Sequence, residues 1–239
     1  MSTTAVAHAH AGHPPTTTGL DHRKIAIWAF IGSECMLFAS LISTYLIYKG
    51  RSHTGPFPHE WWCKTTNATS AAGPIAGCPA DALFKPILNI PVTSQSTFVL
   101  LMSSLAMVLA LAAVENKDKP GWAGPGLGGR ILESSKLWLL ATAILGAGFL
   151  CYQAFEFTSF VHEGLTIRTN LFGSSFFTLT GFHGAHVTAG VLWLLTLLGI
   201  DMKRGLGPRD ALLVDISALY WHFVDVVWIA IFTLVYLIR

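Results

Sequence analysis

Five long apolar segments constrain the fold of this 239-residue chain more than any other feature. A helix needs about 20 mostly apolar residues to cross the hydrocarbon core of a membrane, and each segment is long enough. Barrel strands would be about ten residues long with alternating polarity, whereas these segments are apolar on all faces. The sequence therefore predicts an all-α protein, a polytopic membrane bundle of five transmembrane helices within 25–239. The predicted spans are 25–48, 87–114, 137–160, 172–200 and 212–238.

The composition is typical of a chain that lies in the apolar interior of a membrane. Only 12% of the residues are charged and 52% are hydrophobic, whereas a soluble domain carries about 25% charged residues. The net charge of +2 is small, and the Lys and Arg residues are scattered. A nucleic acid is therefore not expected as a partner.

A polar segment, 1–24, precedes the first span. It lacks the basic and apolar regions of a signal peptide, so we interpret it as a disordered cytoplasmic tail. His8, His10 and His13 lie in it, and nothing in the sequence fixes their geometry for a metal ion.

The distribution of Lys and Arg predicts the orientation, because cytoplasmic loops carry an excess of these residues. One side of the predicted bundle has nine of them and the other has six, so the N-terminus is expected in the cytoplasm and the C-terminus in the periplasm. The nine are Arg23, Lys24, Lys117, Lys119, Arg130, Lys136, Lys203, Arg204 and Arg209, and the six are Lys49, Arg51, Lys64, Lys85, Arg168 and Arg239.

The long loop 50–86 is then periplasmic and contains Cys63 and Cys78. An oxidising compartment allows a disulfide between them, and two free thiols are the alternative. The pair does not indicate a structural zinc site, which requires four ligands.

Few ionisable side chains fall well inside the predicted spans. A charged group at the centre of a bilayer costs about 2.5–3.5 kcal/mol, so each is expected to face protein, water or a partner. The positions of interest are Glu34, Glu156, His183, His186, His222 and Asp225, and Trp221 and Trp228 flank the last two in the fifth span.

The spacing groups four of these side chains into a seam. His183 and His186 are three residues apart and are predicted to share a helix face, and the same spacing would let His222 and Asp225 hydrogen-bond to each other. Small residues around the two histidines favour close packing of the fourth span against another helix. We therefore predict a His, Asp and Trp seam between the fourth and fifth spans.

Three interpretations of these polar groups remain open from the residues alone. They could fix helix packing, ligate a haem through His183 or His186 with His222, or form a proton pathway through Glu34, Glu156 and Asp225. No motif for a phosphate site, a nucleophile or a catalytic metal is present. On its chemistry, the chain is expected to support a reaction that another subunit performs.

Four segments resemble subunit III of the haem–copper terminal oxidases, in order and in spacing. They are GSECMLFA (32–39), YQAFEF (152–157), FGSSFFTLTGFHGAHV (172–187) and YWHFVDVVW (220–228). The segments GFHGAHV and WHFVDVVW are the most specific. The resemblance covers about 25–239, and the common long form of the family has two more helices at its N-terminus, so this chain is similar to the short five-helix bacterial form.

The resemblance implies an accessory subunit in the bacterial plasma membrane, packed on subunit I, with subunit II and small subunits as further partners. It implies that haem and copper belong to partner subunits, that this chain binds no metal and that phospholipid is bound. Stabilisation of subunit I, support of proton uptake, and access of oxygen and lipid are the implied roles. By motif match, Glu34 corresponds to a membrane-buried glutamate of the family near subunit I. The family's recurrent polar and aromatic positions correspond to Glu156, His183, His186, His222, Asp225, Trp221 and Trp228.

Other interpretations come from different classes. A membrane cytochrome b would hold a haem between two of the histidines, and a transporter would move a substrate without partner subunits. Within the family, a cytochrome c oxidase is the main expectation and a quinol oxidase the alternative.

Overall fold

The computed structural model describes residues 21–49, 51–52, 55–119, 121–124 and 126–238. Five helical segments in this part of the chain are long and apolar enough to cross a membrane, as the sequence predicts. They are α1 (His22–Tyr48), α2 (Ile90–Glu115), α4 (Ser135–His162), α5 (Leu171–Arg204) and the segment Pro208–Leu237. The last comprises the short turn η2 (Pro208–Asp210), α6 (Ala211–Ile231) and the π-helical η3 (Phe232–Leu237).

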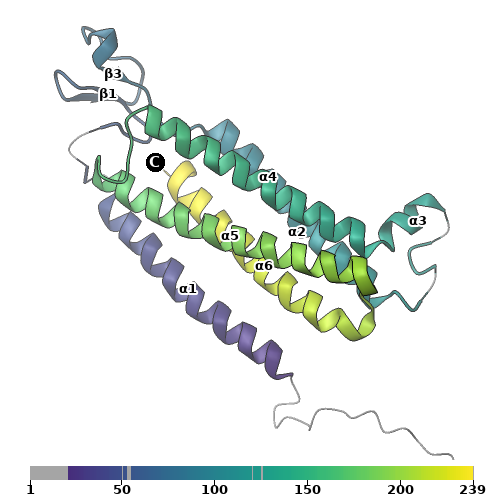
Figure 1. Cartoon of the computed structure of the whole chain (residues 1–239). Coiled ribbons are helices and arrows are strands. Elements are labelled where there is room, and N and C mark those ends of the chain that lie inside the picture. The colour runs from purple at the N-terminus through teal and green to yellow at the C-terminus, as the bar shows by residue number, and fades with distance from the viewer. Residues whose placement is uncertain (1–20, 50, 53–54, 120, 125, 239) are drawn as a thin grey trace, which may run out of the picture.

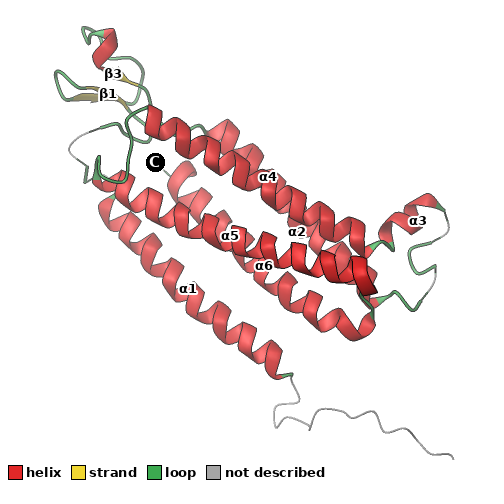
Figure 2. Ribbon diagram, viewed as in Figure 1, coloured by secondary structure: helices red, strands yellow, loops and turns green. Residues whose placement is uncertain are grey.

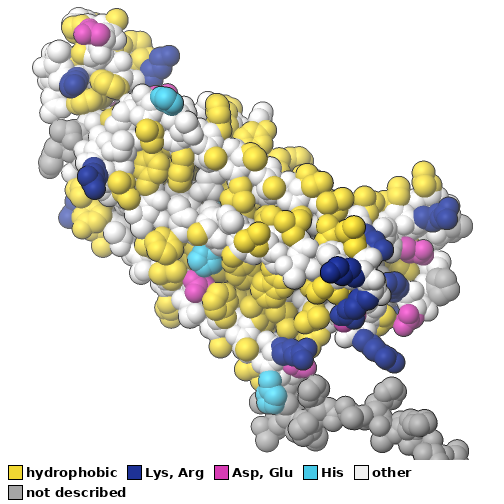
Figure 3. Space-filling model, viewed as in Figure 1, with side chains coloured by type: hydrophobic (Ala, Val, Ile, Leu, Met, Phe, Trp, Pro, Cys, Tyr) yellow, Lys and Arg dark blue, Asp and Glu magenta, His cyan; other side chains and the backbone are white. Residues whose placement is uncertain are grey.

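The five segments run side by side as a bundle with two different ends (Figures 1 and 2). At one end, the basic end, lie the start of α1, the short helix α3 (Leu127–Leu132) and the turn between α5 and α6. The Lys and Arg side chains of this end form a visible group (Figure 3). A small β-sheet marks the other end, the sheet end.

Local signals explain several helix boundaries. The Asp21 side chain caps α1 by accepting a hydrogen bond from the Arg23 amide, and Asn170 caps α5 in the same way through the Gly173 amide. Pro91 stands in the first turn of α2, where its missing N–H costs nothing. Gly205 ends α5 with a φ of 72°, a conformation that favours glycine.

The start of the first span differs from the prediction. Helix α1 begins at His22, so 22–24 are helical although we assigned them to the polar tail. The tail residues 1–20, with His8, His10 and His13, and the terminal Arg239 lie outside the described residues.

The loop 50–86 contains a sheet that the sequence did not predict. Strand β1 (Trp61–Cys63) pairs antiparallel with β2 (Ala68–Ser70) on one edge and with β3 (Leu83–Phe84) on the other; the short turn η1 (Ala80–Ala82) precedes β3. Cys63 is joined to Cys78 by a disulfide, 15 residues along the chain. Strands of two or three residues are too short to show the alternation of polar and apolar residues that identifies a strand in a sequence, so this sheet could not be predicted.

Helix α6 is the centre of the bundle and α1 is its periphery. Half of the residues of the last span (50%) are buried, against 11% in α1. Three polar contacts attach α1 along its length. Lys24 pairs with Asp215 of α6 at 2.8 Å, Glu34 contacts His186 of α5, and the Lys49 ammonium donates to the Ile238 carbonyl at 2.6 Å.

Two tryptophans connect α6 to the other core helices. The Trp221 ring lies against Gly146 of α4 and Gly190 of α5, where a Cβ atom would approach the ring to 2.5 Å and 2.8 Å. Its indole N–H donates to the Ser103 hydroxyl of α2 at 2.9 Å. Two turns further along α6, Trp228 donates to the Thr97 hydroxyl of α2 at 3.0 Å. Four helices thus meet at Trp221.

Candidate functional site

The structure distributes the polar groups predicted inside the membrane over four positions. Glu34 and His186 meet between α1 and α5, and Glu156 contacts α2 and η3. His222 and Asp225 lie beside Ser104 of α2. The predicted seam between the fourth and fifth spans is present in part, because His183 of α5 contacts the Val224 carbonyl and the Trp228 ring of α6.

Glu34 and His186 form a half-buried pair. The Glu34 carboxyl lies 3.1 Å from Nε2 of His186, and the edge of the Phe38 ring packs on the imidazole at 5.1 Å between ring centres. The other ring nitrogen, Nδ1, lies 2.8 Å from the Phe182 carbonyl oxygen. A carbonyl only accepts hydrogen bonds, so Nδ1 carries a proton.

The contact gives each polar group a partner. A carboxyl in contact with an imidazole is far less costly in a membrane than an isolated carboxylate.

His183 is completely buried at the contact between α5 and α6. Its Nε2 lies 3.3 Å from the Val224 carbonyl oxygen, and its ring packs against Trp228 and Phe149. Although His183 and His186 are three residues apart, one faces the core and the other faces α1. His183 therefore fills a packing position, and its Nδ1 has no hydrogen-bond partner among the described residues.

His222 and Asp225 do not hydrogen-bond to each other, contrary to the expectation from their spacing. His222 Nδ1 lies 2.6 Å from the Ser104 hydroxyl of α2. The Asp225 carboxyl is buried beside the same serine, and neither of its oxygens has a hydrogen-bond partner in the described part of the chain.

Glu156 of α4 is buried and has two partners from distant segments. The Thr93 hydroxyl of α2 donates to one carboxyl oxygen, and the Tyr236 hydroxyl of η3 donates to the other at 3.3 Å. These bonds join three helical segments near the sheet end.

Sequence reasoning missed the hydroxyl side chains of α2. Four of them form side-chain hydrogen bonds with other helices: Thr93 with Glu156, Thr97 with Trp228, Ser103 with Trp221 and Ser104 with His222. A signal was present, because these residues recur at helical spacing along an otherwise apolar segment. Hydroxyl groups in membrane helices often bond between helices, and this stripe could have identified the face of α2 that contacts α6.

The histidines considered for a haem have partners within the protein. Among the described residues, no three His, Cys, Asp or Glu side chains are grouped to hold a metal ion. His183 and His222, two candidates for a haem, are each directed at a hydrogen-bond partner on a neighbouring helix.

Comparison with known proteins adds independent information. The family model for cytochrome c oxidase subunit III matches residues 89–238. The cytochrome c oxidase subunit 3 of Bacillus sp. (strain PS3) is 38% identical over 90% of this chain and 86% of its own length. The quinol oxidase subunit 3 of Bacillus subtilis (strain 168) is 32% identical over 95% of this chain and 96% of its own length. The cytochrome c oxidase subunit 3 of Synechocystis sp. is 34% identical over 97% of this chain.

The fold and the site define a polytopic helical membrane subunit in which the ionisable groups serve helix contacts. The chain belongs to the cytochrome c oxidase subunit III family, and it is a non-catalytic accessory subunit of a haem–copper oxidase. The predicted resemblance is confirmed, and it is favoured over the membrane cytochrome b and the transporter.

We predict that Glu34→Gln and Glu34→Leu differ in their effect on stability. A glutamine amide can keep a hydrogen bond to Nε2 of His186, so Glu34→Gln is expected to leave the assembled complex intact. Glu34→Leu removes the partner of a half-buried imidazole and should destabilise the attachment of α1 by about 1–3 kcal/mol. Thermal dissociation of the purified oxidase, followed on native gels, measures both. Loss of assembly with Glu34→Gln would show that the carboxyl itself is required.

Proposed function

We propose that this chain stabilises the catalytic subunit I of a cytochrome c oxidase through its α1 face. Two observations support this face. Helix α1 is the least buried span, and the Glu34–His186 pair is only partly covered, with 18% and 15% of the side chains exposed. A polar pair at mid-membrane depth is better accommodated against protein than against lipid. Haem and copper then belong to the partner subunits, and subunit II and small subunits complete the complex.

The basic end is proposed to face the cytoplasm, which places the N-terminus inside and the sheet end, with the C-terminus, in the periplasm of a bacterial plasma membrane. The group of Lys and Arg side chains at this end supports the assignment (Figure 3). Acidic groups accompany them there, as in the Lys24–Asp215 and Arg204–Asp210 pairs. Such titratable groups support a further role in proton uptake from the cytoplasm.

A cytochrome c oxidase is proposed over a quinol oxidase. The relative from Bacillus sp. (strain PS3), a cytochrome c oxidase subunit, is 38% identical, against 32% for the quinol oxidase subunit of Bacillus subtilis. The purified complex is expected to oxidise reduced cytochrome c. Oxidation of quinol alone would assign it to the alternative.

Photocrosslinking tests the proposed contact face. We expect p-benzoylphenylalanine in place of Met36 of α1 to crosslink to the haem-containing subunit in the intact oxidase, because this side chain is 76% exposed on the outer side of α1. The matched control is the same substitution at Ile144 of α4, which is 60% exposed on another helix and should crosslink to lipid. Crosslinks to subunit I from Ile144 and not from Met36 would contradict the assignment.

Thiol labelling tests the orientation together with the disulfide. A membrane-impermeant maleimide added to intact spheroplasts is expected to label Cys63 and Cys78 only after reduction, because the disulfide occupies both thiols and the sheet end is proposed to face the periplasm. The free cysteines Cys35 and Cys151 lie within spans and serve as internal controls. Labelling of Cys63 and Cys78 without reduction would contradict the disulfide, and labelling only in inverted vesicles would contradict the orientation.

A further inference from the structure

The loop 50–86 is more elaborate than a connection between two helices requires. It contains the three-stranded sheet and the Cys63–Cys78 disulfide, and the family match, which covers 89–238, does not include it. Figure 1 shows the sheet beyond the end of α4, outside the helix bundle. A long connection with a fold of its own is more often functional than a plain link.

The sheet has a small core of its own. The Trp62 ring packs against Phe84 of β3, with 5.2 Å between the ring centres. The indole N–H of Trp62 donates to the Asn67 side chain at 2.9 Å, next to the start of β2. Together with the disulfide, these contacts fix the shape of the sheet.

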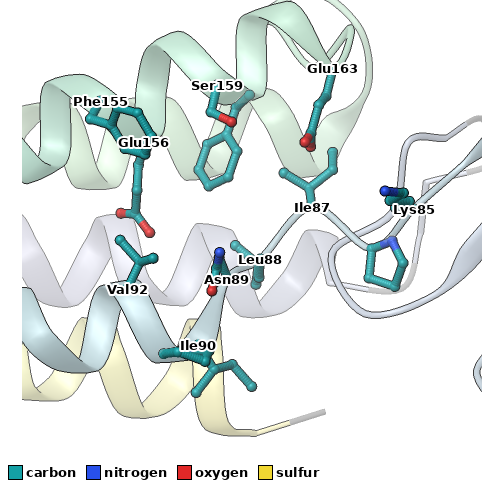
Figure 4. Close-up of a pocket in the computed structure, with 13 residues that line it drawn as sticks. Lys85, Ile87, Leu88, Asn89, Ile90, Val92, Phe155, Glu156, Ser159 and Glu163 are labelled. Atoms are coloured by element: carbon teal, nitrogen blue, oxygen red, sulfur yellow. The ribbon is translucent and has the colours of Figure 1, made fainter.

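Backbone hydrogen bonds attach this loop to the helix bundle. Ile87 and Leu88, which border the pocket between α2 and α4 (Figure 4), donate through their amides to the Phe57 and Pro58 carbonyls at 3.3 Å. The surface of the sheet is therefore held in place before any partner binds, which lowers the entropic cost of binding.

A groove of about 510 Å³, the sheet groove, lies between the sheet and the ends of α1 and α5. Asn67, Thr69 and Ala71 line it, and alternate residues of a strand share one face, so the groove follows one face of β2. Phe57 and Phe172 contribute apolar surface. None of the polar groups of the candidate site borders this groove.

Strand β2 is an edge of the sheet. The strand order is β2-β1-β3, so within the described residues no strand pairs with the outer side of β2. The free N–H and C=O groups of an edge strand can pair with an extended segment of another polypeptide. Every second side chain of such a segment would then lie over the face that forms the sheet groove. Because β2 has only three residues, these side-chain contacts are needed in addition to the backbone bonds.

Glu60 gives the sheet groove a preference for a basic side chain. It lines the groove, it is exposed, and no ion pair joins it to another described residue. Lys49, the positive charge of the groove, donates instead to the Ile238 carbonyl at 2.6 Å. A Lys or Arg side chain of the occupant can therefore form a charge-assisted hydrogen bond with Glu60.

The sheet groove continues the exposed side of α1. Lys49 and Ser52, which line the groove, directly follow the last turn of α1. A subunit that packs along α1 therefore reaches the groove where it leaves the membrane.

We propose that the sheet groove binds an extended segment of the oxidase subunit that packs on α1. The segment pairs with the edge of β2, places an apolar side chain against Phe57 and Phe172, and directs a Lys or Arg side chain at Glu60. This inference rests on the proposed function, because it takes the partner of α1 as the source of the segment.

Photocrosslinking in the intact oxidase tests the occupant. We expect p-benzoylphenylalanine in place of Thr69 to form an adduct with the same subunit that crosslinks from Met36, and mass spectrometry should map it outside the membrane spans of that subunit. The matched control is the same substitution at Thr66, an exposed threonine of the β1–β2 turn that does not line the groove. Its yield is expected to be about tenfold lower.

A charge reversal tests the role of Glu60. With the crosslinker at position 69, Glu60→Lys is expected to lower the yield about tenfold, as for a lost charge-assisted bond. Asp81→Lys reverses an exposed charge of the same loop away from the groove and should leave the yield unchanged. If Glu60→Lys does not assemble, the comparison of Thr69 with Thr66 decides.

The outcomes separate this inference from the proposed function. An adduct from Met36 without one from Thr69 would overturn the inference and leave the proposed contact face intact. Adducts from Thr69 with lipid, a soluble protein or another subunit would overturn it too, as would equal yields from Thr66 and Thr69 or equal effects of the two charge reversals. A failure of Met36 to reach any subunit would contradict the proposed face, and with it the source of the segment.

Discussion

The hydrogen bonds from the indole N–H groups of Trp221 and Trp228 to hydroxyls of α2 are the contacts on which the rest of the bundle depends. Lipid offers no acceptor for a buried N–H, so each indole must find one within the protein. Ser103 and Thr97 supply these acceptors, and they fix both the rotation and the height of α6 against α2. The glycines at 146 and 190 then let α4 and α5 approach the Trp221 ring closely.

The positions of the ionisable groups follow from this frame. With α6 fixed, His183 is held against Trp228, and Asp225 is held beside Ser104. Helix α1 lies at the periphery and attaches through polar contacts, of which the Glu34–His186 pair is the deepest. The most buried span is thus the one that contains α6, and the most exposed is α1.

The sequence predicted the part of the fold that depends on local pattern. The five spans are apolar over about 20 residues each, and such a signal needs no tertiary information. The partner of Glu34 was not predictable in this way, because His186 lies 152 residues away and its selection depends on how α1 leans against α5. The same holds for Glu156, whose partners come from α2 and η3. The expected bond between His222 and Asp225 is absent because Ser104 of α2 takes its place at His222.

The most direct test of this account is the close approach at Trp221. Gly146→Ala places a Cβ 2.5 Å from the rigid indole ring, whereas Gly148→Ala, two residues along the same helix, meets only Val99 at 3.9 Å. Both changes replace a glycine inside α4 by alanine, so both raise the helix propensity equally. The difference in stability between the two variants therefore measures the contact with the Trp221 ring. The thermal stability of this subunit in the purified oxidase is expected to fall by about 1–3 kcal/mol for Gly146→Ala relative to Gly148→Ala. Equal stability of the two variants would contradict the central place assigned to Trp221.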